Sequence, residues 1–252
     1  MISDTKVVAI GGGTGLSTML KGLKLHTHNI TAVVTVADDG GSSGILRSDL
    51  GMLAPGDVRN CVSALAEVDP VMGELLNFRF KDGSLKGHSL GNLFLAALNE
   101  TSSSFDEAVK KFSHLTGVVG TVYPVTNESV TLSALLEDGR LIEGESHIGV
   151  HHDGPKNGIV KLMVNPEKPK AVDGVIKALE KADIIVLGPG SLYTSIIPNL
   201  LVDGVVDAIK KSNAVKIYVC NIMSQAGETE NYTVSDHLAA IERHSYEGIA
   251  DI

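Results

Sequence analysis

Short apolar runs that alternate with helical patterns are the feature that most limits how this chain can fold. The runs are bounded by Gly, Pro, Asp or Asn, and the first two fall at about residues 6–11 and 30–36. The second run is nearly all β-branched or apolar, which is typical of a parallel strand covered on both faces. The alternation predicts an α/β fold with a mainly parallel sheet and helices on both faces.

The same patterns place the remaining elements. Further strands are expected at 183–187, 215–220 and 248–252, and helices at about 16–25, 57–69, 70–80, 89–101, 105–115, 171–182 and 233–244. Residues 121–165 predict a small antiparallel hairpin inserted into the α/β pattern, because a Glu-Asp-Gly turn separates two strand-like runs. We expect one domain over residues 1–252, and a C-terminus that looks truncated, because the last expected strand ends with the chain.

Composition excludes several classes of function. The 252 residues are 43 % hydrophobic, which is enough for a sizeable core. A net charge of −9 and an aromatic content of 4 % disfavour a nucleic-acid partner, which needs cations and stacking side chains. Two distant cysteines, Cys61 and Cys220, suit a reducing compartment. The apolar run at 7–10 is too short for a signal peptide or a membrane span, so we expect a cytoplasmic protein without membrane insertion.

A glycine-rich loop follows the first expected strand, at the carboxyl end where open parallel sheets bind ligands. Glycines let backbone amides approach a phosphate, and the next helix adds its dipole. The candidate residues for binding a nucleotide or diphosphate are Gly12, Gly13, Thr14 and Gly15. The loop lacks the third glycine of a dinucleotide motif and the lysine of a P-loop, which disfavours both of those activities. A tight turn without a ligand is the alternative.

The loop after the second expected strand carries two carboxylates and two serines. Asp38 or Asp39 could bind ribose hydroxyls, or hold Mg²⁺ together with substrate phosphates, although such a run is more often only a turn. Ser42 is a candidate binding residue and also the serine of a G-x-S-x-G pattern. Two aspartates and two glycines separate it from the strand, which disfavours a hydrolase nucleophile.

Two later segments have the composition of helix starts. Asp57 is expected to cap its helix, and Arg59 and Asn60 follow in the first turn, where a cation is unfavourable unless an anion is close. Arg59 facing a phosphate would resolve that conflict. His88 or Ser89 begins an apolar helix, and capping and ligand contact stay equally open for them.

Two more polar loops follow the strands at 183–187 and 215–220. Their candidate residues, which offer hydroxyl, amide and backbone donors, are Gly190, Ser191, Tyr193 and Asn221. His151, His152 and Asp153 could bind a metal, but their position beside Gly-Pro favours a solvated loop. The convergence of four loops is a more specific signal than any one of them.

Six motifs, taken in order, resemble the CofD/YvcK family, and most of all its YvcK branch, the bacterial gluconeogenesis factors. The motifs are GGGTG, VADDGGSSG, PGDVRN, GHSLGNL, GPGSLYTSIIPNLL and NIMSQAGET. The resemblance extends from about Lys6 to Ile252. It implies a Rossmann-like fold and a protein that binds UDP-sugars such as UDP-N-acetylglucosamine without turnover. It also implies a role in growth on gluconeogenic carbon sources and in cell shape, with cell-wall synthesis proteins as partners.

The resemblance also implies roles for single residues. The first glycine loop would face the diphosphate or nucleotide, Asp38 the ribose or base, and Asn92, Ser191 and Tyr193 the remaining polar groups. The CofD branch implies an alternative, a Mg²⁺-dependent 2-phospho-L-lactate transferase in which Asp38 and Asp39 hold the metal. The binding role names no catalytic residue and requires no cofactor. A homodimer is expected by analogy.

One position departs from the family pattern. Ile45 stands where a basic residue is expected, which leaves Arg47 as the nearest cation. This departure counts against phosphate contact by the loop.

Overall fold

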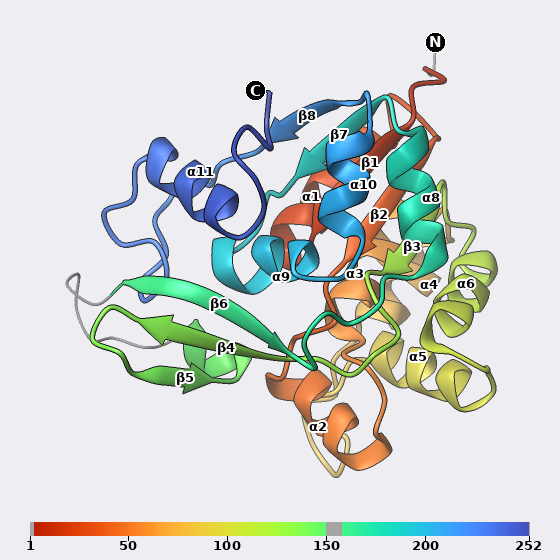
Figure 1. Cartoon of the computed structure of the whole chain (residues 1–252). Coiled ribbons are helices and arrows are strands. Elements are labelled where there is room, and N and C mark those ends of the chain that lie inside the picture. Colours follow the sequence, from red (N-terminus) through yellow and green to blue (C-terminus); the bar gives the residue numbers. More distant parts are fainter. Residues whose placement is uncertain (1–2, 150–157, 252) are drawn as a thin grey trace.

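The computed structural model describes residues 3–149 and 158–251. Five parallel strands form the central sheet in the order β3-β2-β1-β7-β8 (Figure 1). The strands are β1 (Val7–Gly11), β2 (Ile30–Val34), β3 (Thr121–Pro124), β7 (Ile184–Leu187) and β8 (Val215–Tyr218). The central β1 strand is buried along its whole length, as its apolar run predicts. The predicted α/β class with a mainly parallel sheet is confirmed.

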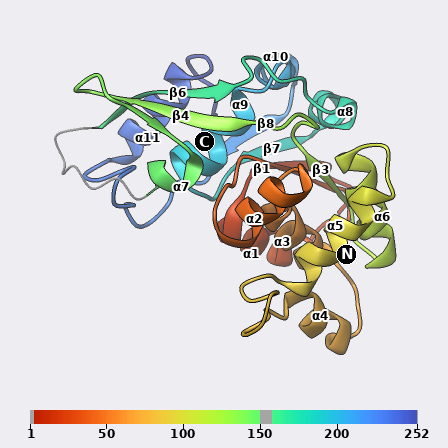
Figure 2. The same cartoon turned by 90° about the horizontal axis from the view of Figure 1, so that it is seen from below.

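Helices cover both faces of this sheet, with α1 and α3 on one side and α8 and α10 on the other (Figure 2). The first six helices are α1 (Gly13–Leu23), α2 (Gly41–Leu50), α3 (Gly56–Leu65), α4 (Pro70–Asn77), α5 (Leu90–Glu100) and α6 (Phe105–Leu115). The later helices are α7 (Glu145–Ile148), α8 (Asp173–Lys181), α9 (Ile197–Leu200), α10 (Val205–Lys211) and α11 (Val234–Arg243). A π-helical turn, η1 (Leu192–Ile196), precedes α9.

A second, antiparallel sheet contains three strands in the order β5-β4-β6 (Figure 1). They are β4 (Thr131–Leu136), β5 (Leu141–Glu143) and β6 (Ile159–Asn165), and α7 follows β5 directly. The predicted hairpin is confirmed, but its expected start at residue 121 is wrong. Residues 121–124 form β3, which pairs with β2 and belongs to the central sheet.

Three other local expectations are wrong. The first helix begins at Gly13 rather than near residue 16, because the chain turns immediately at a positive φ of 68°. The loop after β2 becomes helical at Gly41, where hydrogen bonds of Ser42 to distant side chains override the low helix propensity of glycine and serine. Residues 248–251 form no strand, although the Asp251 amide donates to the Lys216 carbonyl at 2.7 Å.

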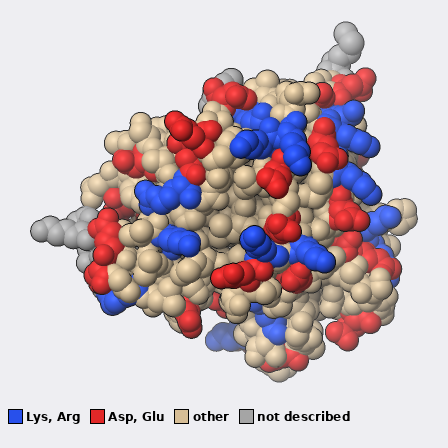
Figure 3. All heavy atoms as spheres, viewed as in Figure 1, with Lys and Arg blue, Asp and Glu red and all other residues tan. Residues whose placement is uncertain are grey.

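The surface is mixed in charge on the face seen in Figure 3, where Lys and Arg side chains are interspersed with Asp and Glu. Within residues 3–149 and 158–251, no helix is long and apolar enough to cross a membrane. Residues 151–153, for which the sequence favours a solvated loop over a metal site, lie outside the described residues.

Candidate functional site

A cavity of about 420 Å³ opens at the carboxyl ends of the central strands. Loops that follow β1, β2, β7 and β8 meet there, together with the start of α3 and the short helix α7. The described residues that line it are Gly13, Asp38, Asp57, Glu145, Ser146, Gly149, Ser191, Thr194, Ser195 and Gln225. Glycines, hydroxyls, carboxylates and one amide make up this lining, so the cavity offers both hydrogen-bond donors and acceptors.

The N-terminus of α1 forms one wall. Gly13 has a φ of 68°, a conformation that favours glycine. The N-cap Gly12 offers no side-chain acceptor to the first amides of this helix, and the Gly13 amide donates to the carboxylate of Asp57 instead. Gly15 packs against the loop after β7, where a Cβ atom would lie 2.9 Å from the carbonyl oxygen of Pro189. The two glycine-rich loops therefore depend on each other for their shape.

A second part of the lining, the carboxylate wall, consists of Asp38, Asp57 and Glu145. Burial, followed by the charge of Asp38, raises the pKa of Asp57 to about 6. Burial, followed by the charges of Asp38 and Asp39, raises the pKa of Glu145 to about 7. Asp57 and Glu145 therefore retain their protons to higher pH, which reduces the repulsion between the carboxylates of this cavity.

Sequence reasoning missed Asp57 and Glu145 as site residues. The prediction that Asp57 caps α3 is wrong, because Pro55 is the N-cap and Asp57 lies within the first turn. Its side chain is therefore directed to the cavity and accepts a hydrogen bond from the Gly13 amide. No local signal marks Glu145, since α7 reaches the cavity through contacts with residues that are distant in the sequence.

Asp39 joins that sheet to the central one. Its Oδ2 accepts the Glu145 amide hydrogen at 2.9 Å, and its Oδ1 accepts that of Ser146 at 2.8 Å. A carboxylate in this position stabilises a helix N-terminus. Asp39 therefore holds α7, and with it the side chain of Glu145, against the loop that follows β2.

We expect Asp39→Ala to free α7 and to lower the free energy of unfolding by about 1 kcal/mol. Hydrogen exchange measured by NMR should become faster at the amides of Glu145 and Ser146, which lose their acceptor. Asp69→Ala is the matched control, because Asp69 caps α4 through the Val71 amide. Unchanged exchange in α7 of the Asp39 variant would contradict this role.

The buried carboxylate of Glu228 organises the loop after β7. It is 3 % exposed and accepts hydrogen bonds from the Tyr193 amide at 3.1 Å and the Thr194 hydroxyl at 3.2 Å. It also accepts one from the Gln225 side-chain amide at 2.8 Å, and the Ser191 hydroxyl donates to Gln225 at 2.7 Å. The hydroxyls of Ser191 and Thr194, which line the cavity, are therefore held in place by the loop that follows β8.

Tyr193 belongs to the same segment but is not among the described residues that line the cavity. The side chain is fully buried, and its hydroxyl donates to the Ile159 carbonyl at 3.2 Å. The same hydroxyl oxygen lies 2.9 Å from the Tyr232 hydroxyl. Burial raises the pKa of Tyr193. The structure thus places Tyr193 as a link between the loop after β7 and the antiparallel sheet.

Four predicted or open candidates form a buried network and are not among the described residues that line the cavity. Arg59 donates to the side-chain oxygens of Asn92 at 3.3 Å and Asn77 at 2.8 Å. Asn92 donates to the Ser42 hydroxyl at 3.0 Å, which lies 3.0 Å from His88 Nδ1. Burial lowers the pKa of Arg59. This network joins α2, α3 and α5, so it supports the loops rather than lining the cavity.

The remaining candidates have backbone or packing roles. Asn221 donates to the Gly190 carbonyl at 2.7 Å, which ties the loops after β7 and β8 together. The Thr14 carbonyl accepts hydrogen bonds from two hydroxyls of the next turn, and Asn60 lies half-buried within α3. Arg47, the cation expected beside the second loop, donates to the carbonyls of Ala37, Asp38 and Val130. Ser89 caps α5 through the Asn92 amide.

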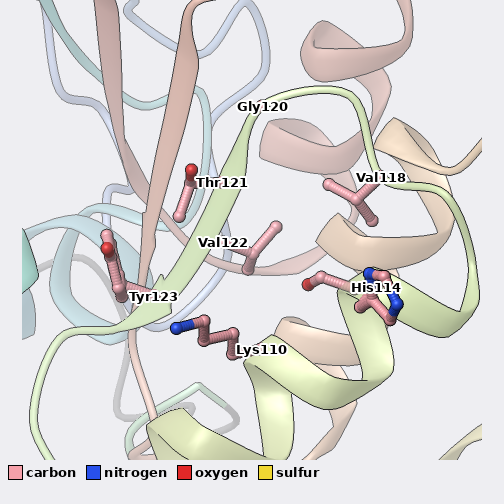
Figure 4. Close-up of a pocket in the computed structure, with 8 residues that line it drawn as sticks. Lys110, His114, Val118, Gly120, Thr121, Val122 and Tyr123 are labelled. Atoms are coloured by element: carbon pink, nitrogen blue, oxygen red, sulfur yellow. The ribbon is translucent and has the colours of Figure 1, made fainter.

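A second hollow, of about 300 Å³, lies between α6 and β3 (Figure 4). Lys110 and His114 line it from the helix, and Val122 extends toward the helix from the strand. It includes Gly120 and Thr121 at the amino end of β3, away from the carboxyl ends where the first cavity opens. None of the predicted site residues lines this hollow.

Comparisons with known proteins match the order of these motifs. Residues 7–252 match the family described as 2-phospho-L-lactate transferase CofD. A Clostridium acetobutylicum protein is 54 % identical over 97 % of this chain, which spans 54 % of that protein's length. The gluconeogenesis factor of Bacillus subtilis is 47 % identical over 98 % of the chain, which spans 77 % of that relative.

A crystal structure of a UPF0052 family protein from Bacillus halodurans agrees with the fold. It has a TM-score of 0.94 and 47 % identity, and the match covers 100 % of this chain and 80 % of the other. With the shared fold, the motif order and the sequence identity in agreement, this chain belongs to the CofD family, within its group of gluconeogenesis factors.

Proposed function

We propose that this chain binds a nucleotide sugar of the UDP-N-acetylglucosamine type in the cavity at the carboxyl ends of its central strands. The output is binding rather than turnover, and the bound state supports growth on gluconeogenic carbon sources and formation of the cell wall, through proteins of wall synthesis. The name gluconeogenesis factor carried by the Bacillus subtilis relative supports the metabolic part of this proposal.

One observation carries the binding proposal: a single cavity combines anion-binding donors with hydroxyl-binding carboxylates. The backbone amides at the α1 N-terminus and the Ser195 hydroxyl suit a diphosphate, whereas the hydroxyl protons of Ser191 and Thr194 are donated to Gln225 and Glu228. Asp38, Asp57 and Glu145 suit groups that donate hydrogen bonds, such as the hydroxyls of ribose and of a sugar. A nucleotide sugar carries both kinds of group, whereas inorganic phosphate or a simple nucleotide leaves part of the cavity unmatched.

Calorimetric titration tests this proposal. We expect UDP-N-acetylglucosamine and UDP-glucose to bind without Mg²⁺, and at least about tenfold more tightly than GTP or NAD, because their pyranose ring is bonded directly to the diphosphate and presents its hydroxyls beside it. Mass spectrometry of the mixtures should find no product. A guanine nucleotide that binds more tightly, and only with Mg²⁺, would contradict the proposal and favour the transferase.

The alternative is the activity in the family description, transfer of 2-phospho-L-lactate with Mg²⁺. Its favouring observation is the carboxylate wall, since Mg²⁺ prefers oxygen ligands together with substrate phosphates. A magnesium site made of Asp38 and Asp39 together does not fit the structure, because both carboxylate oxygens of Asp39 accept amide hydrogens of α7. Within the described part of the chain, no group of three or more potential ligands could hold a metal ion.

A further inference from the structure

The loop after β8, which contributes Gln225 to the cavity lining, exposes two consecutive apolar side chains. Ile222 is 99 % exposed and Met223 is 78 % exposed, and in the described parts of the chain no other large hydrophobic side chain is as exposed as either. Their loop runs between β8 and α11 (Figure 1). Apolar side chains exposed in this way are unfavourable in water, and covering them with a ligand lowers the free energy.

Hydrogen bonds hold this loop to the cavity on both sides of the pair. Asn221 donates to the Gly190 carbonyl at 2.7 Å, and Gln225, which lines the cavity, accepts the Ser191 hydroxyl at 2.7 Å. The Gln225 amide also donates to the buried Glu228 at 2.8 Å. Ile222 and Met223 therefore lie on a segment that is tied to the cavity loops on both sides of the pair.

The cavity itself contains no apolar partner for a heterocyclic base. Its described lining includes no large apolar side chain, whereas ligand pockets usually combine a few polar groups with apolar surface. Its volume of about 420 Å³ is also near the lower end of the usual range of ~300–1,000 Å³. A nucleotide sugar whose diphosphate and sugar occupy this cavity has its base at the rim.

We propose that Ile222 and Met223 form the platform on which the planar base of the bound nucleotide packs. The inference rests on the proposed function and adds the subsite that discriminates a nucleotide sugar from a simple sugar phosphate. A thioether against an aromatic ring is a favourable contact, and the β-branched side chain beside it supplies a stiff apolar surface. The side-chain amide of Asn221, directly before the pair, fixes the position of this segment relative to the loop after β7.

The test compares two ligands that differ by the uridine phosphate. UDP-N-acetylglucosamine and N-acetylglucosamine 1-phosphate are titrated into the wild-type chain and the double variant Ile222→Ser/Met223→Ser. We expect the variant to lose roughly tenfold in affinity for the nucleotide sugar, because the base contact is removed, and to retain its affinity for the sugar phosphate. Leu25→Ser is the matched control, since Leu25 is 72 % exposed beyond the C-terminal end of α1, remote from the cavity.

A direct contact measurement completes the test. With Met methyl groups labelled, an intermolecular nuclear Overhauser effect is expected between the Met223 methyl and H6 of the bound uracil. Binding of the nucleotide sugar without this effect and without loss in the double variant would overturn the platform while leaving the proposed function intact. Failure of the wild-type chain to bind any UDP-sugar would instead overturn the proposed function. A change in sedimentation of the double variant, with unchanged affinity, would show that a second copy covers the patch and would also overturn the platform.

Discussion

Glu228→Ala is expected to lower the free energy of unfolding by roughly 3 kcal/mol and to abolish ligand binding. The variant removes the acceptor of the Tyr193 amide, the Thr194 hydroxyl and the Gln225 side chain. A buried donor left without a partner loses its hydration and gains nothing in return, which explains the size of the effect. The same contacts position Thr194 and Gln225 in the cavity lining, so the variant is expected to lose the shape of the cavity as well as stability of the fold.

Urea denaturation and calorimetry check this expectation on the same samples. Glu230→Ala is the matched control, because it removes a carboxylate two residues away on the same segment and leaves the three contacts of Glu228 in place. Ligand binding should survive in the control. A Glu228 variant with the wild-type urea midpoint would show that its three contacts contribute little, and would contradict the expectation.

Much of the fold could be predicted because its signals are local. The strands β1 and β2 are continuous apolar runs bounded by glycine or aspartate, and a central parallel strand requires that pattern. Residues 121–124 were assigned to the wrong sheet, because a four-residue strand carries no mark of its neighbour. The helix at Gly41–Leu50 was missed, because contacts between Ser42 and Asn92 outweigh the local preference for a turn.

The candidate site was predictable where backbone geometry alone determines it. Glycine loops after β1 and β7 follow from their position at strand ends, and the structure brings them together near Gly15 and Pro189. Side-chain roles were less accessible, because they depend on tertiary partners. Asp39 binds a helix more than 100 residues away, and Arg59 contacts two asparagines rather than the cavity. No spacing in the sequence encodes these contacts.

Asp57→Asn is expected to raise the free energy of unfolding at pH 8 by up to about 3 kcal/mol while weakening ligand binding. In the folded chain, burial and the nearby charge of Asp38 raise the pKa of Asp57 from 3.8 to about 6. Between these two values the unfolded chain binds fewer protons than the folded chain. The free energy of unfolding contributed by this group therefore falls as the pH rises from about 4 to about 6, and it stays lower above that.

The asparagine variant has no carboxyl group to ionise, and its side-chain oxygen still accepts the Gly13 amide hydrogen. Urea denaturation at pH 5 and pH 8 should therefore show a gap between variant and wild type that widens with pH. Asp173→Asn is the control, because it changes an exposed carboxylate in the first turn of α8. An equal gap at both pH values would show that the carboxylate of Asp57 ionises in the folded chain without cost. Higher stability together with weaker binding would identify Asp57 as a residue kept for the ligand at the expense of the fold.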